Sequence, residues 1–256
     1  MIIYIAGYGR SGSTALDLAL GEIDGVMSCG ELVSLPAEVV SYDFAKCGCG
    51  NLYDECEIWS DLSSTITSED RDCSIYNNMI LPVRLLFSLL FFFRHRKFLR
   101  RKDGDEFNRR VVDYIYNLVG PSCIVDSSKS SWFASLRPYS LKRAGFEVFV
   151  IHLQRDLFGV LESVKRGDNK ALMGDKSKGK AFAVFRAFIT YSYANFIGWF
   201  LGFSFPRIKV KQKDLKENPD LVVSNIMSEI CHSYPDVAFF GSFKSHVVSG
   251  NRLKFK

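Results

Sequence analysis

Hydrophobic positions along the chain fall into short apolar runs that are separated by stretches with helical spacing. Helices are predicted at 15–20, at 105–119, from Leu157 onward and from Asp214 towards Cys231, whereas the polar residues 61–73 predict a loop. Strands that alternate with helices are typical of an α/β fold, in which helices flank a central and mostly parallel sheet. Apolar runs predict strands at Ile2–Ala6, Val26–Cys29, Ser122–Asp126 and Phe146–Leu153, and a fifth strand is predicted after Pro206, at Arg207–Val210.

A turn rich in glycine and serine joins the first predicted strand to the first predicted helix. Glycines let the backbone curl until its N–H groups converge, and the helix behind adds the positive end of its dipole. The turn therefore predicts a phosphate-binding loop, with a plain strand-to-helix connection as the alternative. Its sequence is Gly7-Tyr8-Gly9-Arg10-Ser11-Gly12-Ser13-Thr14.

This turn departs from the P-loop pattern G-x-x-x-x-G-K-[ST] at one position. The match runs from Gly7 through Gly12 to Thr14, but Ser13 stands where the pattern has lysine. That lysine reaches the β- and γ-phosphates of a nucleoside triphosphate, so its absence disfavours kinase or ATPase activity. Arg10 supplies positive charge from inside the loop, which favours a nucleotide whose phosphate is not the end of a triphosphate.

Composition limits the class of protein. With 256 residues, of which 47% are hydrophobic, the chain can bury one core, and we expect a single domain over 1–256. The net charge of +5 is spread along the chain, which disfavours a nucleic-acid-binding surface but would suit an anionic ligand or a membrane surface. The first apolar run is too short for a signal peptide, so we expect a cytoplasmic protein whose seven cysteines are mostly free.

Two longer apolar stretches raise the question of membrane contact. Residues 79–93 fall short of the roughly 20 residues that span a bilayer, and a basic run follows at 94–97. The segment 79–97 predicts either an interfacial or acceptor-binding helix with a basic flank, or an ordinary lid or core helix. Ala181–Phe205 contains Arg186 and has helical apolar spacing in its early part, which favours a core helix over a span.

Polar residues that suit anion chemistry follow several predicted strands. Glu31 follows the second strand, and Lys129 follows the third among hydroxyl side chains. Arg155 follows the fourth strand, and Ser163 lies eight residues later in the next helix. Parallel sheets bind ligands at the carboxyl ends of their strands, and arginine suits bidentate phosphate binding. Taken one at a time, each residue could equally be an ordinary surface side chain.

Three closely spaced cysteines, Cys47, Cys49 and Cys56, precede Trp59. They could bind a metal, form a disulfide, or pack as thiols near the tryptophan. A closed zinc site needs four ligands, and no further cysteine or histidine lies nearby in the sequence. We therefore expect no metal.

Together, these residues resemble the sulfotransferases that use 3′-phosphoadenosine 5′-phosphosulfate (PAPS). Residues 10–14 are similar to the family's 5′-phosphosulfate loop, and 127–129 to its Ser-Lys segment near the sulfuryl group. Arg155 and Ser163 match, in type and in spacing, the arginine and serine that hold the 3′-phosphate. The tract 29–31 resembles that of tyrosylprotein sulfotransferases, whose glutamate acts as base.

Two further segments resemble those of bacterial members, namely an insertion at Cys47–Trp59 and a tail at His246–Lys254. The tail implies donor contacts from its glycine, asparagine and a basic residue. The Lys-Thr-His tract of cytosolic sulfotransferases is absent, so no histidine is assigned as base, and His152 is expected in the core. Nothing is recognised between 61 and 121, and we expect a helical or lid insertion at about 40–120, where the acceptor would be selected.

The resemblance implies a three-layer P-loop NTPase-like fold and an enzyme that transfers a sulfuryl group from PAPS to a hydroxyl or amine. Glu31 would be the catalytic base, with Lys129 and Arg10 as catalytic cations, and no metal would take part. The acceptor would be a glycan, a lipid-linked saccharide or a small molecule. The alternatives are a P-loop kinase-like protein and a non-catalytic, membrane-associated scaffold. The residues implied to bind the donor are Arg10, Ser11, Gly12, Ser13, Thr14, Arg155, Ser163, Gly250, Asn251 and Arg252.

Overall fold

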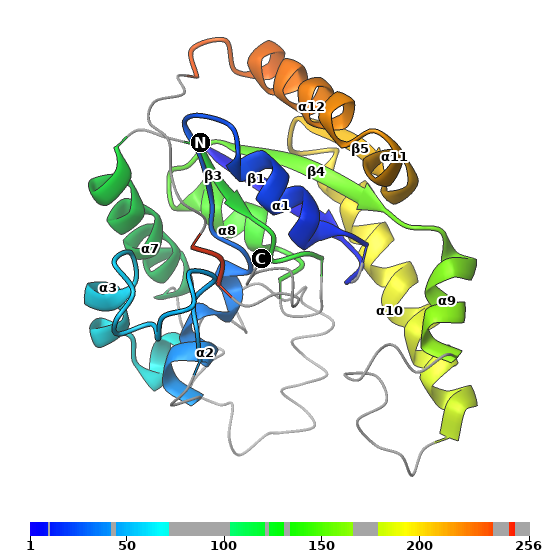
Figure 1. The fold of residues 1–256 in the computed structure, drawn as a ribbon, viewed down its shortest axis with the longest axis horizontal. Helices are drawn as coiled ribbons and strands as arrows, with labels where there is room; N and C mark the ends of the chain where they lie inside the picture. The colour runs from blue at the N-terminus through cyan, green and yellow to red at the C-terminus, as the bar shows by residue number, and fades with distance from the viewer. Residues whose placement is uncertain are drawn as a thin grey trace.

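The computed structural model describes residues 1–9, 11–41, 45–71, 103–120, 123–130, 134–165, 179–237 and 246–248. In this part of the chain, one sheet has the strand order β2-β3-β1-β4-β5, and every neighbouring pair is parallel (Figure 1). The predicted α/β class and the five predicted strands are therefore confirmed. The strands are β1 (Ile2–Gly7), β2 (Val26–Ser28), β3 (Cys123–Asp126), β4 (Val148–Gln154) and β5 (Arg207–Lys211).

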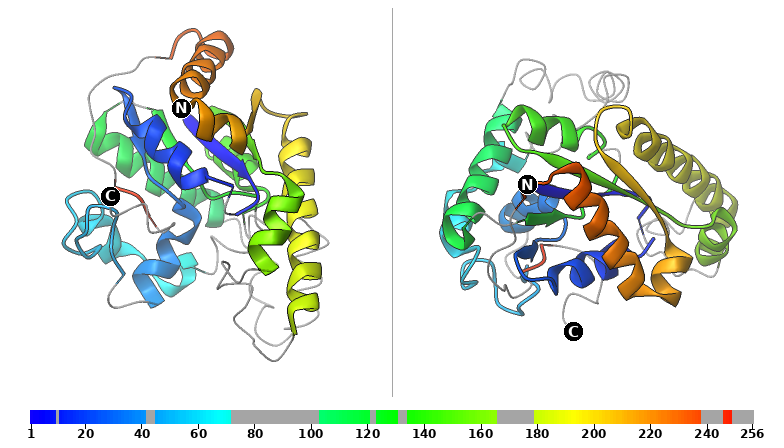
Figure 2. Two further views of the ribbon diagram at one scale, coloured as in Figure 1. Left: turned by 45° about the vertical axis from the view of Figure 1, so that its right-hand side comes forward. Right: turned by 90° about the horizontal axis from the view of Figure 1, so that it is seen from above.

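Helices cover both faces of the sheet, which gives three layers (Figure 2). Because side chains alternate along a strand, Ile3 and Ile5 of β1 face one layer and Ile2 and Tyr4 face the other. The first layer contains α1 (Ser13–Gly21), α11 (Gln212–Glu217) and α12 (Pro219–Ser233). The second contains α2 (Leu35–Ser41), α3 (Ser60–Thr65), α7 (Asp103–Val119), α8 (Arg137–Arg143) and α10 (Gly179–Leu201).

The parallel register brings the carboxyl ends of the strands to one edge of the sheet. Gly7, at the end of β1, pairs with Leu153 of β4. On the other side of β1, Tyr4 pairs with Asp126, the last residue of β3. The loops that follow β1, β3 and β4 therefore leave the sheet side by side, which is where open parallel sheets bind their ligands.

Two predicted elements were wrong. The helix expected from Asp214 towards Cys231 is divided into α11 and α12, because Pro219 has no N–H to donate and keeps the preceding residue out of the helical region. Asn218 accordingly has φ −143° and ψ 70°. The segment 61–73, expected to be a loop, includes most of α3, and Leu62 of this helix is buried in the core of the second layer.

The α10 helix is only half buried. Ala187, Ile197 and Leu201 face the core, whereas Phe185 and Trp199 are exposed, so the expected core helix buries one side. None of the helices in the described ranges is both long and apolar enough to cross a membrane. The predicted contact segment 79–97 lies outside these ranges.

Candidate active site

The predicted phosphate loop connects β1 to α1 at the carboxyl edge of the sheet. Gly7 has φ +140°, and a Cβ atom there would lie 2.2 Å from the Leu153 carbonyl oxygen, so the close strand pairing requires glycine. The Ser11 hydroxyl donates to the Tyr8 carbonyl oxygen at 2.6 Å, which closes the turn. Gly12 caps α1 at φ +94°, and the buried Ser13 and Thr14 begin the helix. The N-terminus of α1 thus lies at the carboxyl edge of the sheet, and the N–H groups of a helix start suit an anion.

Glu31 follows β2 and is fixed through its backbone. Its N–H donates to the Val248 carbonyl oxygen at 2.8 Å, and the Val248 N–H donates to the Cys29 carbonyl oxygen at 2.8 Å. Gly30 has φ +75°, and a Cβ atom there would lie 2.4 Å from the Val248 oxygen, so the two segments meet at backbone contact distance. The Glu31 side chain is 20% exposed and forms an ion pair with Lys129 Nζ.

Lys129 has φ +65°, the only positive value among the non-glycine residues that the structure describes. Its N–H donates to the Ile5 carbonyl oxygen at 3.2 Å, and its carbonyl oxygen accepts a bond from the Tyr4 hydroxyl at 2.5 Å. The neighbouring Ser130 exchanges bonds with the Gly7 backbone, at 3.1 Å and 3.2 Å. The loop that carries the lysine is therefore anchored to β1 and to the start of the phosphate loop.

Arg155 and Ser163 lie on the other side of β1, after β4. The Arg155 guanidinium donates to the Gly159 carbonyl oxygen at 3.0 Å in the first turn of α9 (Leu157–Lys165). Ser163 is buried one turn beyond Gly159, on the same side of that helix. Tyr8 of the phosphate loop packs against α9, so this loop and the arginine–serine pair share one end of the sheet.

Asp17 is a buried polar residue that sequence reasoning missed. It lies in α1 and is fully buried, and its two carboxylate oxygens accept bonds from the Ser28 and Ser127 hydroxyls, each at 2.6 Å. Burial raises the pKa of Asp17 to about 7, although the two hydroxyl bonds oppose that shift. The sequence signal was weak because an aspartate in an amphipathic helix is usually a solvent-exposed side chain. In this fold it ties α1 to the ends of β2 and β3.

Four of the predicted donor contacts, Arg10, Gly250, Asn251 and Arg252, lie outside the described residues. His152 is buried in β4, as expected, and desolvation lowers its pKa to about 4. An open pocket of about 560 Å³ lies against α2 and α3. None of the predicted site residues lines this pocket; its lining includes Val39, Leu52, Tyr53, Asp61 and Ser64.

No protein-family model and no curated protein sequence matches this chain. Two solved structures share its fold, each with a TM-score of 0.50 at 18% sequence identity and each covering 90% of this chain. One is the sulfotransferase domain from the curacin biosynthetic pathway, of which the match covers 73%. The other is the sulfotransferase domain of the olefin synthase from Synechococcus PCC 7002, of which it covers 72%.

The chain has the same fold as these two domains. The three-layer arrangement that the sequence implied is therefore confirmed over most of the molecule. At 18% sequence identity, the similarity to these structures shows only a shared fold. Any statement about chemistry has to rest on the residues at the carboxyl edge of the sheet. That edge holds a glycine-rich turn at a helix start, a lysine–glutamate pair, and an arginine that bonds to the first turn of α9, the helix that contains Ser163.

Proposed function

We propose that this protein transfers a sulfuryl group from PAPS to a hydroxyl or amine of an acceptor. The acceptor atom attacks the sulfur, a new bond to sulfur forms, and the bond from sulfur to the 5′-phosphate oxygen breaks. Its electron pair leaves with 3′-phosphoadenosine 5′-phosphate (PAP), and the acceptor proton passes to Glu31. Like phosphoryl transfer, this reaction needs the protein mainly to align the reactants and to neutralise charge.

The observation that best supports the proposal is the Glu31–Lys129 pair beside the phosphate loop. A carboxylate that is four-fifths buried and an ammonium group on an anchored loop stand at the strand edge where the loop after β1 begins. The carboxylate suits a general base, and the ammonium suits the charge that develops on the leaving phosphate. Their ion pair holds each group in a fixed position until substrates separate them.

The donor would lie along the carboxyl edge of the sheet, from the loop after β1 to the loop after β4. Its 5′-phosphosulfate would contact Arg10 and the turn from Ser11 to Thr14, where the N–H groups at the start of α1 suit an anion. Its 3′-phosphate would contact Arg155 and Ser163. The bond from the Arg155 guanidinium to Gly159 of α9, and the place of Ser163 one turn further along that helix, support this role. The tail residues Gly250, Asn251 and Arg252 would close over the donor.

Calorimetry with PAP tests the donor assignment. PAP should bind the full chain without Mg²⁺, and Arg155→Ala should weaken that binding by about 10-fold or more, because a charged hydrogen bond is worth about 1.5–3 kcal/mol. Arg143→Ala is the matched control, since Arg143 is an exposed arginine on α8 that pairs with Asp105. Binding of ATP that depends on Mg²⁺, with no binding of PAP, would instead support a kinase-like protein.

Transfer of radiolabelled sulfate from PAPS tests the reaction. Glycan, lipid and small-molecule extracts serve as acceptors, which also separates the acceptor classes left open by the sequence. Glu31→Gln should leave PAP affinity unchanged and lower turnover by about 100-fold or more. Lys129→Gln should lower turnover by a similar factor, on the order of 3 kcal/mol of transition-state stabilisation. Absence of transfer to every class would favour a non-catalytic scaffold, and full turnover by the Glu31 variant would assign the base elsewhere.

A further inference from the structure

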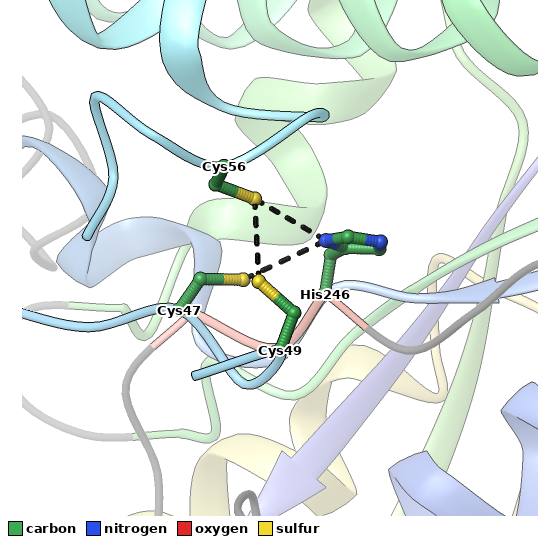
Figure 3. A group of neighbouring side chains, drawn as sticks. All are labelled: Cys47, Cys49, Cys56 and His246. Atoms are coloured by element: carbon green, nitrogen blue, oxygen red, sulfur yellow. Dashed lines mark hydrogen bonds between the residues drawn. The ribbon is translucent and has the colours of Figure 1, made fainter. Parts of the chain in front are cut away.

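Three cysteines and one histidine meet in the layer that contains α3 and α7. Cys47, Cys49 and Cys56 come from the segment before α3, whereas His246 comes from a part of the chain almost 200 residues later (Figure 3). The four candidate ligand atoms all lie within 4.8 Å of one another. The sequence suggested only three ligands because the fourth reaches the cluster through folding.

The spacing of these atoms matches a tetrahedral metal site. Zinc bonds of about 2.3 Å to sulfur and 2.0–2.1 Å to nitrogen place two sulfurs about 3.8 Å apart, and a sulfur and a nitrogen about 3.6 Å apart. The Cys49 and Cys56 sulfurs are 3.7 Å apart. His246 Nδ1 lies 3.2 Å from the Cys56 sulfur and 3.8 Å from the Cys47 sulfur. A disulfide would need two sulfurs near 2.05 Å, would use only two cysteines and would give the histidine no role.

The histidine ring is oriented for coordination through Nδ1. Its Nδ1 lies within 3.8 Å of the Cys56 and Cys47 sulfurs, and its Nε2 lies 3.1 Å from a carboxylate oxygen of Glu57. A carboxylate that orients a metal-binding histidine in this way is the usual second partner in zinc sites. The ring itself is 3% exposed, so water does not compete for it.

Backbone bonds hold the cluster in place. The Gly50 N–H donates to the Cys47 carbonyl oxygen at 3.0 Å, which turns the chain between the first two cysteines. The Gly48 N–H donates to the Val247 carbonyl oxygen at 3.0 Å. The Trp59 indole N–H donates to the His246 carbonyl oxygen at 3.0 Å, and its ring is fully buried. These bonds hold both the cysteine segment and the histidine in position.

We propose that Cys47, Cys49, Cys56 and His246 together bind one structural zinc ion. Three thiolates and one imidazole are a common ligand set for zinc, and four protein ligands leave no open position for a substrate. Each coordinating thiol releases its proton to solvent. The ion would join the segment before α3 to residues 246–248, whose Val248 pairs with the Glu31 backbone. It would therefore support the geometry of the Glu31 region without taking part in transfer.

Metal analysis of the full chain, purified with reductant and without chelator, tests the proposal. Mass spectrometry of the metal content should give about one zinc per chain. Replacing zinc by Co²⁺ should give the strong near-ultraviolet absorption of a thiolate–cobalt bond and the visible bands of a tetrahedral ion. A chain that holds no metal and takes up neither ion at micromolar concentration would overturn the proposal. So would an intact mass lower by two hydrogens, with two of the three cysteines joined in a disulfide.

Variants distinguish this site from adventitious metal. Cys49→Ser removes one of the three thiolate ligands and should clearly weaken the thiolate–cobalt absorption and lower the affinity for the ion, whereas Cys231→Ser, at the exposed cysteine of α12, should change neither. Glu57→Ala should lower zinc affinity by about 10-fold, because it removes only the partner of the histidine. If Cys49→Ser does not fold, the metal content of the unmodified chain and of the Glu57 variant still tests whether the chain binds zinc at this cluster. Equal zinc affinity in all three variants would refute the ligand set.

Discussion

The buried ion pair between Arg137 and Asp126 allows a direct test of what stabilises the loop that carries Lys129. Arg137 Nε lies 2.5 Å from Asp126 Oδ2, and the two side chains are at most 1% exposed. The other carboxylate oxygen of Asp126 accepts bonds from the Ser128 N–H, at 3.0 Å, and from the Ser128 hydroxyl. Arg137 Nη1 donates to Asn108 at 2.6 Å. This network fixes the residue that immediately precedes Lys129.

Arg137→Ala should destabilise the protein strongly. It leaves the Asp126 carboxylate buried without its counter-charge, a change that costs about 3–5 kcal/mol, whereas an entire domain is stable by about 5–15 kcal/mol. The matched control is Arg143→Ala on the same helix, because the Arg143–Asp105 pair is 54% and 31% exposed. An exposed pair of this kind contributes about 1 kcal/mol or less.

Urea unfolding followed by circular dichroism measures the two free energies. For Arg137→Ala we expect the midpoint to fall with an unchanged m-value, which indicates lost stability rather than a changed unfolded state. The double variant Arg137→Met/Asp126→Leu should recover only part of the loss. It removes the unpaired charge but leaves the Ser128 N–H and the Asn108 oxygen without these partners. If Arg137→Ala cost no more than Arg143→Ala, the claim that this buried network supports the lysine loop would be refuted.

Two further predictions concern Asp17 and the phosphate loop. Because folding raises the pKa of Asp17 from its ordinary 3.8 to about 7, the folded state keeps a proton that the unfolded chain loses. This contribution to stability is fully present below about pH 4 and disappears as pH rises to about 7, on the order of 4 kcal/mol in total. Asp17→Asn should flatten that pH dependence in urea unfolding, and an unchanged slope would contradict the assignment. Gly7→Ala should lower stability by about 2 kcal/mol or more, because Gly7 has φ +140° and no room for Cβ, whereas Gly9→Ala, with nothing within 4 Å, should change the thermal midpoint little.

Much of the fold could be predicted from the sequence because its elements follow local rules. Apart from β5, in which Ile208 and Val210 alternate with basic residues, the strands are mostly apolar runs. Glu31, Lys129 and Arg155 each come within a few residues of the end of such a run. The break at Asn218–Pro219 was equally visible and was missed because apolar spacing continued past the proline. That error shows that periodicity alone does not define a helix boundary.

Other features depended on contacts between distant residues. Asp17 and Arg137 lie in helices whose patterns give no sign that polar side chains are buried there. The burial follows from hydroxyls and a carboxylate that other strands bring to them. The fourth member of the cysteine cluster, His246, was missed for the same reason, since its partners lie almost 200 residues earlier.

The contact between Glu31 and Val248 has a consequence for folding order. The bonded backbones are more than 200 residues apart, and closing a flexible loop of that length costs about 5 kcal/mol in chain entropy. In a growing chain, β1 and the phosphate loop can form early, but the surroundings of Glu31 stay open until residues 246–248 are made. During synthesis the sheet can therefore form before the surroundings of Glu31, the proposed base, are complete, and the proposed site is complete only when residues 246–248 dock.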